Sequence, residues 1–173
     1  DDFDGELYFD GPPPAPLKSR PGSEGVIYIG TPSKMLFPGL RLGWIAAAEP
    51  VIRRLARIRQ IADLSGSPLL QAALARFAGS GELARHMPRV REAYGRRLAR
   101  LVDALERHMP EGVTWTRPRG GLSLLLTLPE GLDSGRLLAE AGAAGVLYSP
   151  GRMFFINDGA RHLRLSFGNV ATA

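Results

Sequence analysis

One long run of helical periodicity constrains this chain more than any other feature. Between Glu82 and His108, apolar residues recur in steps of three and four, at Leu83, Met87, Val90, Tyr94, Leu98, Leu101 and Leu105. This spacing places all of them on one face of a single helix. The sequence therefore predicts a long helix that packs along this face, and not a cofactor-binding motif.

Shorter elements flank that helix on both sides. We expect strands over 26–29 and 41–47, a helix beginning at Glu49 and a second one over 69–77. After the long helix we expect strands over 113–116, 122–128, 146–149 and 162–167, with a helix from Asp133 to Ala144. The pattern predicts an α/β fold in three parts: residues 1–48 belong to a sheet domain, 49–108 form a helical connection, and 109–173 form a small α+β domain.

The composition excludes several function classes. The 173 residues contain no cysteine, which excludes disulfides, a thiolate nucleophile, a cysteine-ligated zinc and an iron–sulfur cluster. The three histidines lack metal-site spacing, so we expect no metal. No apolar run approaches the roughly 18 residues of a membrane helix, and no signal peptide opens the chain. We expect a cytoplasmic protein without membrane contact.

The basic residues are unevenly divided between the two types. The net charge is +5, yet of 22 basic residues only Lys18 and Lys34 are lysines. The arginines are scattered through helical segments, which favours solvated helix faces over a nucleic-acid footprint. Arginine cannot become a neutral amine, so it cannot replace a lysine that forms a Schiff base. Lys18 lies in a Pro- and Gly-rich loop, and Lys34 has a more unusual setting.

Residues 30–44 are the part of the chain richest in chemical groups. Lys34 lies in a loop between two expected strands, close to the hydroxyls of Thr31 and Ser33 and seven residues before Arg41. Loops at strand ends are where α/β proteins place ligand chemistry. Hydroxyls and an arginine suit a phosphate, and a partly desolvated lysine suits imine formation. A purely structural loop is an equally good interpretation of these residues by themselves.

The segment 30–44 resembles the lysine motif of fold-type-I pyridoxal-phosphate enzymes in the class I/II aminotransferase family. Four further segments resemble family landmarks in the same order, at residues 1–7, 117–122, 149–155 and 163–167. The resemblance implies the C-terminal half of such a protein: part of the large-domain sheet, linking helices and the small domain. Because the chain also begins without methionine, we expect it to be a fragment.

The resemblance implies a catalytic pair. Lys34 would hold pyridoxal 5'-phosphate through a Schiff base, and would then act as the base between the substrate Cα and the cofactor. Asp1 would pair with the pyridine nitrogen and keep it protonated. The neighbouring Asp2 is the alternative, and the spacing to Lys34 favours Asp1. Phe3 and Asp4 stand where many relatives carry a tyrosine that contacts the phenolic oxygen.

The resemblance also implies binding residues. Ser33 and Arg41 would hold the cofactor phosphate, with Thr31 as a weaker candidate, and Arg164 would bind the substrate α-carboxylate. Arg161 competes with Arg164, but the Arg-Leu-Ser-Phe context favours Arg164. Two serines, Ser65 and Ser67, would either reach the phosphate of a partner subunit or cap a helix.

Two functions follow from the resemblance. The first is an aminotransferase that moves an amino group between an amino acid and a 2-oxo acid, active as a homodimer. The second is the effector domain of a MocR/GntR-type regulator, which would bind DNA only through a preceding domain. The segment that includes His86, Arg89, Arg91 and Tyr94 resembles both the MocR-type and the 2-aminoadipate-type subgroups. We expect the isolated chain to be inactive, because other family residues supply the ring-stacking aromatic and the remaining phosphate contacts.

Overall fold

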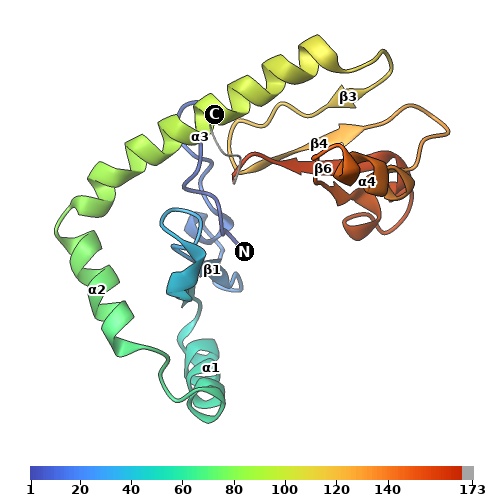
Figure 1. The fold of residues 1–173 in the computed structure, drawn as a ribbon. Helices are drawn as coiled ribbons and strands as arrows, with labels where there is room; N and C mark the ends of the chain where they lie inside the picture. Colours follow the sequence, from blue (N-terminus) through green and yellow to red (C-terminus); the bar gives the residue numbers. More distant parts are fainter. Residues whose placement is uncertain (169–173) are drawn as a thin grey trace. The chain divides into compact units, whose positions relative to one another are not determined.

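The computed structural model describes residues 1–168 and divides the chain into two compact units, with the boundary between Arg91 and Glu92. This boundary falls inside the long helix α3 (Glu82–His108), which has the bounds that its apolar periodicity predicts (Figure 1). The domain boundaries expected near residues 48 and 108 stay a prediction.

The first unit combines a strand pair with helices. Strands β1 (Tyr28–Gly30) and β2 (Trp44–Ala46) pair antiparallel, with Gly30 opposite Trp44. Short 3₁₀ turns cover η1 (Leu17–Ser19) and η2 (Pro38–Leu40), and helices α1 (Glu49–Ala62) and α2 (Pro68–Gly79) follow β2. Each of these two helices carries a proline in its first turn, where the missing N–H costs nothing.

Strand β2 is shorter than the sequence predicts. We expected a strand from residue 41, but Arg41 adopts a left-handed backbone with φ of 50° and closes the turn η2. A residue in this conformation cannot continue a strand. The pairing therefore begins only at Trp44.

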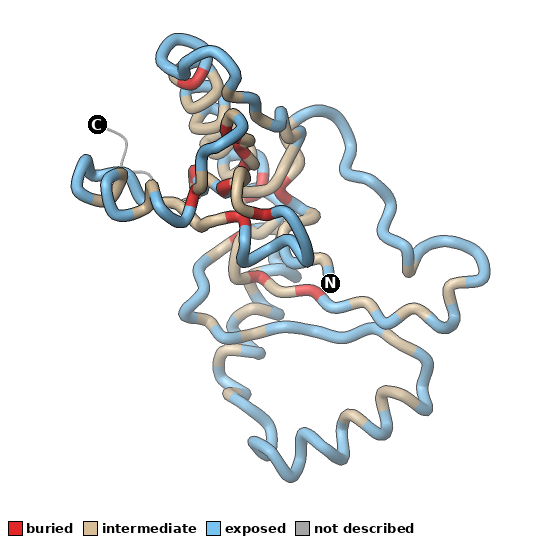
Figure 2. The backbone as a smooth tube through the Cα atoms, turned by 90° about the vertical axis from the view of Figure 1, so that its right-hand side faces the viewer, coloured by how far each residue is buried: buried red, intermediate tan, exposed pale blue. Residues whose placement is uncertain are grey.

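The second unit contains a four-stranded antiparallel sheet in the order β3-β4-β6-β5. Its strands are β3 (Thr114–Trp115), β4 (Ser123–Thr127), β5 (Ser149–Pro150) and β6 (His162–Ser166), together with helix α4 (Ser134–Ala143) and turns η3 (Gly151–Met153) and η4 (Gly159–Arg161). Alternate residues of β4, Leu124 and Leu126, are buried with Leu105 of α3 and Leu163 of β6. Figure 2 shows the buried residues of the described chain in red. This core holds the sheet against the second half of α3.

The expectation of a strand over residues 146–149 was wrong for most of its length. Only Ser149 and Pro150 pair, opposite Arg164 and Leu163 of β6. The side chain of Leu147 is 82% exposed, so its apolar character does not reflect burial within the described residues. The helix start was predicted correctly, since the Asp133 carboxylate accepts a hydrogen bond from the Gly135 N–H at 2.8 Å.

No helix within residues 1–168 is both long enough and apolar enough to cross a lipid bilayer.

Candidate functional site

The lysine segment begins where β1 ends at Gly30. A Cβ atom at Gly30 would lie 2.5 Å from the indole ring of Trp44, its partner in the register. Only glycine allows this close approach, because no side chain fits between the two strands at this point. The chain therefore leaves β1 beneath the Trp44 ring and turns directly into the segment that carries Lys34.

Thr31 organises the turn through its hydroxyl. Thr31 Oγ1 donates to the carbonyl of Leu42 at 2.7 Å, because a carbonyl oxygen can only accept. It also accepts from the Ser33 N–H at 3.2 Å and lies 2.9 Å from Ser33 Oγ. Since the Thr31 proton is already engaged, Ser33 must be the donor in the bond between the two hydroxyls. Thr31 thus connects the start of the loop to Leu42 near its end through hydrogen bonds. The Ser33 hydroxyl oxygen can still accept hydrogen bonds.

Lys34 lies at the turn between two buried residues. Pro32 is fully buried, Met35 is 8% exposed, and the carbonyl of Pro32 accepts hydrogen bonds from the N–H groups of Met35 and Leu36 at 3.1 and 2.8 Å. Within residues 1–168, Lys34 Nζ makes no hydrogen bond or ion pair, although the residue is partly buried. The turn is therefore held by backbone hydrogen bonds of the neighbouring residues, and the catalytic role of Lys34 stays a prediction.

Carboxylates lie near this amine. Burial raises the pKa of the Asp4 carboxyl, the negative charge of Asp2 raises it further, and the positive charge of Lys34 partly opposes the rise. Asp2 and Lys34 thus both act on the Asp4 carboxyl. The N-terminal segment and the lysine turn are therefore within electrostatic range of each other, although they are far apart in the sequence.

Asp2 is the better anchored of the two candidate acids. Its N–H donates to the carbonyl of Ile29 at 2.8 Å, and it forms an isolated parallel bridge with Gly30. The hydroxyl of Tyr28 donates to Asp2 Oδ2 at 2.9 Å, and burial, followed by this bond, raises the Tyr28 pKa. Asp1 is exposed and lines a hollow of about 360 Å³ on the loop that contains Lys18. The assignment of Asp1 stays a prediction.

Arg41 lies in the same connection but is not joined to Lys34. Its guanidinium reaches the carbonyl of Pro38 at 3.5 Å, and its left-handed backbone is unusual for a residue with a side chain. Arg41 is exposed beside a hollow of about 320 Å³ that Arg59 and Gln71 also line. No hydrogen bond in residues 1–168 links Arg41 to Ser33 or Thr31, so its role in phosphate binding stays a prediction.

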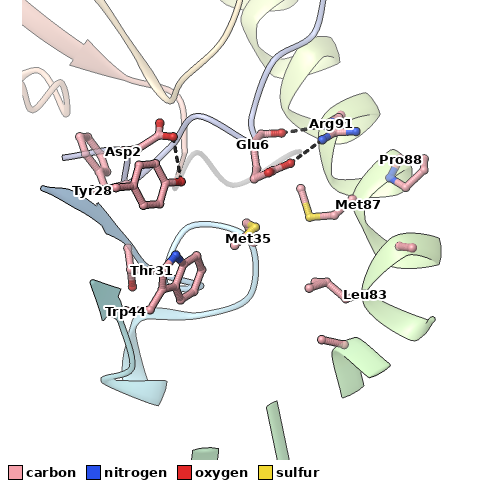
Figure 3. Close-up of a pocket in the computed structure, with 13 residues that line it drawn as sticks. Asp2, Glu6, Tyr28, Thr31, Met35, Trp44, Leu83, Met87, Pro88 and Arg91 are labelled. Carbon is pink, nitrogen blue, oxygen red and sulfur yellow. Dashed lines mark hydrogen bonds and ion pairs between the residues drawn. The ribbon is translucent and has the colours of Figure 1, made fainter. Parts of the chain in front are cut away.

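A pocket of about 500 Å³ lies between the lysine turn and the neighbouring helices. Figure 3 shows the Asp2–Tyr28 hydrogen bond on one side and the Glu6–Arg91 pair on the other, with Met35 between Tyr28 and Met87. Its other lining residues are Phe3, Thr31, Trp44, Ala78, Leu83, Ala84 and Pro88. Of the candidate site residues, Thr31 and the alternative acid Asp2 line it, and Lys34, Ser33, Asp1 and Arg41 do not. This pocket therefore lies on the helix side of the turn.

Arg164 belongs to the second unit, on β6. It lies opposite Leu125 of β4 and Ser149 of β5, its guanidinium stacks over the Phe154 ring at 4.4 Å, and its Nη2 donates to Ser149 Oγ at 3.4 Å. It forms no ion pair within the described part of the chain. A guanidinium supported by an aromatic ring and left without a carboxylate is suited to bind one.

The competing arginine, Arg161, is engaged in the fold. Its Nε donates to the carbonyl of Leu128 at 3.0 Å, and its Nη1 lies 3.6 Å from Glu130 Oε1. Arg161 is thus engaged within the fold, whereas the carboxylate-binding role of Arg164 stays a prediction. Of the two serines, Ser67 caps α2 by accepting from the Leu70 N–H at 3.4 Å, whereas Ser65 is exposed.

Sequence reasoning missed three supporting side chains. Tyr28 was interpreted only as a strand residue, although a tyrosine in a buried run needs a partner for its hydroxyl. Phe154 lies in the segment 149–155, and its contact with Arg164 was not predicted. His86 Nε2 lies 3.1 Å from the carbonyl of Met35, a contact across 51 residues that no local pattern indicates.

The chain belongs to the aminotransferase class I and II family, whose family model matches residues 6–173. The predicted family is therefore confirmed, and so is the predicted fold class, a partial aminotransferase fold of mixed helix and sheet.

Individual relatives support this membership. The chain is 42% identical to aromatic-amino-acid aminotransferase 1 of Thermococcus litoralis over 167 residues, which cover 96% of this chain and 40% of that protein. It is 36% identical to an uncharacterized HTH-type transcriptional regulator, YdfD of Bacillus subtilis, covering 96% of this chain and 34% of that one. A kynurenine aminotransferase of Pyrococcus horikoshii, solved in complex with PMP, matches with a TM-score of 0.92 and 38% identity, covering 97% of this chain and 42% of that chain. The chain thus spans less than half the length of each relative.

Proposed function

We propose that the full-length protein is a pyridoxal-phosphate-dependent aminotransferase that transfers an amino group between an amino acid and a 2-oxo acid. The observation that carries this proposal is Lys34: a partly buried residue whose Nζ makes no hydrogen bond in residues 1–168, in a hydrogen-bonded turn within electrostatic range of Asp4. The related kynurenine aminotransferase bound to PMP supports the same cofactor class. The aromatic-amino-acid aminotransferase among the relatives supports amino acid substrates.

The chemical groups of the first unit fit pyridoxal phosphate. The cofactor needs an amine for its aldehyde, an acid for its ring nitrogen, and hydroxyl or guanidinium donors for its phosphate. The first unit supplies Lys34, the aspartates of its N-terminal segment, Ser33 and Arg41. When bound, the cofactor supplies an electron sink that makes the Cα–H bond of the amino acid acidic.

Each of these residues would then have its own role in the reaction. Lys34 Nζ would hold the cofactor covalently, and once the substrate amine has displaced it, the freed Nζ would take the proton from the substrate Cα as a general base. Asp1 would keep the proton on the ring nitrogen in place. Ser33 and Arg41 would hold the phosphate, with Thr31 fixing the Ser33 hydroxyl, and Arg164 would bind the α-carboxylate in a bidentate pair.

A second function is favoured by one comparison. The regulator of Bacillus subtilis matches nearly the same share of this chain as the aminotransferase of Thermococcus litoralis does. In that case the aminotransferase-like part of the protein would bind pyridoxal phosphate as the effector domain of a MocR/GntR-type regulator. A different domain would bind DNA. Steady-state transamination by the full-length protein would favour the enzyme, whereas DNA binding that responds to pyridoxal phosphate would favour the regulator.

The proposed enzyme is a homodimer. Exposed apolar side chains gather around the connection between α1 and α2, where Ile61, Leu64 and Leu69 are each more than three-quarters exposed. Such side chains in one connection are typical of a surface that another chain covers. Sedimentation equilibrium of the full-length protein would measure the mass.

Borohydride trapping tests the cofactor site directly. We expect that incubating the full-length protein with pyridoxal phosphate, followed by sodium borohydride, leaves a stable phosphopyridoxyl group on Lys34. Peptide mass mapping locates the adduct, and Lys18 is the internal control because its Nζ already donates to the carbonyl of Ser23 at 3.1 Å. A folded protein with no adduct on Lys34 would exclude both proposed functions.

The two candidate acids can be separated by single substitutions. We expect Asp1→Asn to lower kcat by about 10²-fold or more, since an amide cannot keep the ring nitrogen protonated. Asp2→Asn is the matched variant, and it should act mainly by removing the negative charge that accepts from the Tyr28 hydroxyl, since the amide oxygen of asparagine can still accept this bond. A larger loss of kcat in Asp2→Asn than in Asp1→Asn, with both proteins folded by circular dichroism, would reverse the assignment.

A further inference from the structure

The first half of α3 contacts the lysine turn through a histidine. His86 Nε2 lies 3.1 Å from the carbonyl oxygen of Met35, the residue that follows Lys34. Because a carbonyl only accepts, Nε2 must carry the hydrogen and donate it. Met35 is nearly buried, so its carbonyl oxygen accepts a hydrogen bond from His86 in place of one from water. This carbonyl belongs to the residue that follows Lys34.

The orientation of this histidine ring is itself supported. The ring of Phe77 on α2 meets the His86 imidazole edge-to-face, with centroids 6.4 Å apart and an interplanar angle of 66°. On the other side of the turn, the Pro32 carbonyl accepts from the N–H groups of Met35 and Leu36. The Met35 peptide is therefore held from both sides, by the turn itself and by α3.

The same helix contacts the segment that carries the candidate acids. Arg91 Nε donates to the backbone carbonyl of Glu6 at 2.8 Å, and Arg91 Nη2 pairs with Glu6 Oε2 at 2.9 Å. Figure 3 shows both bonds reaching from α3 to this segment. Glu6 follows Asp2 by four residues, and the Leu7 N–H in turn donates to the carbonyl of Asp4. This salt bridge is partly exposed, so it contributes little to the free energy of folding. Its main effect is to fix the position of Glu6 relative to α3.

Both contacts are made by one continuous helix, which contains Pro88 between the two residues. His86 and Arg91 are five residues apart on α3, which corresponds to about 7.5 Å along a helix axis. Met87, which lies between them in sequence, is 7% exposed and helps to pack the helix at this place. A helix that touches the turn at one point and the acidic segment at another sets the distance between the two.

We propose that the first half of α3 is a brace that positions the lysine against the aspartates, with His86 and Arg91 as positioning residues that act through Met35 and Glu6. Its catalytic consequence rests on the proposed function, because both Lys34 and the ring-nitrogen acid must meet one bound cofactor. Displacing a reacting group by about 1 Å can cost about 10²-fold in rate. Neither residue touches the reacting atoms.

Hydrogen exchange on the apoprotein tests the brace without any cofactor. In the full-length protein, His86→Ala should raise the exchange rates of the Met35 and Leu36 amides by about tenfold or more, because the turn loses its outer support. Arg91→Ala should do the same for the Leu7 amide. Arg89→Ala is the matched control: it removes the same charge from an exposed position on the same helix, and we expect no change in either segment.

Steady-state kinetics gives an independent measure. We expect His86→Ala to lower kcat by about 10-fold to 10²-fold, while the KM for the amino acid changes by less than about threefold, since Arg164 is untouched. His86→Gln retains an N–H donor and should recover part of the loss. Equal exchange and equal kcat in wild-type, His86→Ala and Arg91→Ala proteins would overturn the brace.

The two proposals fail in different ways. If wild-type protein traps no phosphopyridoxyl group on Lys34, the proposed function fails, yet the exchange experiment still decides on the brace. If wild-type protein traps the adduct but the variants exchange like wild type, the brace alone fails. Should His86→Ala not fold, Arg91→Ala and His86→Gln decide, and unchanged exchange in both would contradict the proposal.

Discussion

Lys34→Arg should abolish transamination by the full-length protein, with kcat reduced by at least about 10⁴-fold. Arginine keeps the positive charge and approximate length of lysine, so the electrostatic effect on the Asp4 carboxyl is conserved. It cannot lose its proton near neutral pH, however, and therefore can neither attack an aldehyde nor take the proton from Cα. The loss would thus report on chemistry and not on folding.

The second lysine provides a matched control for this experiment. Lys18→Arg makes the same chemical change at a position where Nζ only donates to the carbonyl of Ser23, and arginine can replace that bond. We expect its kcat to stay within about twofold of wild type. The absorbance of bound cofactor, measured alongside activity, should be altered in Lys34→Arg and unaltered in Lys18→Arg. Full activity in a folded Lys34→Arg protein would contradict the proposed function.

Local patterns predicted the helices of this chain better than its strands. The bounds of α3 and the Asp133 cap follow from spacing and from one side chain, both of which can be seen in a short stretch of sequence. The start of β2 depends on the left-handed backbone at Arg41, which a non-glycine residue rarely adopts. The expected strand over 146–149 was apolar, but a strand also requires a partner, and only Ser149 and Pro150 pair.

In the candidate site, too, the sequence predicted which neighbouring residues share a turn but not which distant segments meet. Thr31, Ser33 and Lys34 are nearly consecutive, so their shared turn could be predicted from sequence alone. Contacts between distant segments could not, because no local periodicity specifies which side chains meet. His86 reaches Met35 across 51 residues and Arg91 reaches Glu6 across 85, and these are the contacts on which the proposed brace depends.

Arg164 is the second residue whose replacement should have a large effect. Two charge-assisted hydrogen bonds from one guanidinium to a carboxylate are worth about 1.5–3 kcal/mol each. We therefore expect Arg164→Gln to lower kcat/KM for amino acids by a factor on the order of 10² to 10⁴, mostly through a higher KM. Arg164→Lys keeps the charge but loses the planar fork and its stacking over Phe154, so it should recover only part of the loss.

The competing arginine makes this prediction specific. Arg161→Gln removes the same group from the same strand region, but the group it removes is engaged with the Leu128 carbonyl and with Glu130. It should therefore lower the melting temperature while KM stays near the wild-type value, whereas Arg164→Gln should raise KM with the melting temperature unchanged. Trapping at Lys34 should persist in both variants, because neither arginine belongs to the unit that holds the cofactor. A raised KM in Arg161→Gln with a normal KM in Arg164→Gln would transfer the carboxylate-binding role to Arg161. If Arg164 does bind the substrate, the amine chemistry at Lys34 and the carboxylate recognition come from two separately packed units, and each can be impaired without loss of the other.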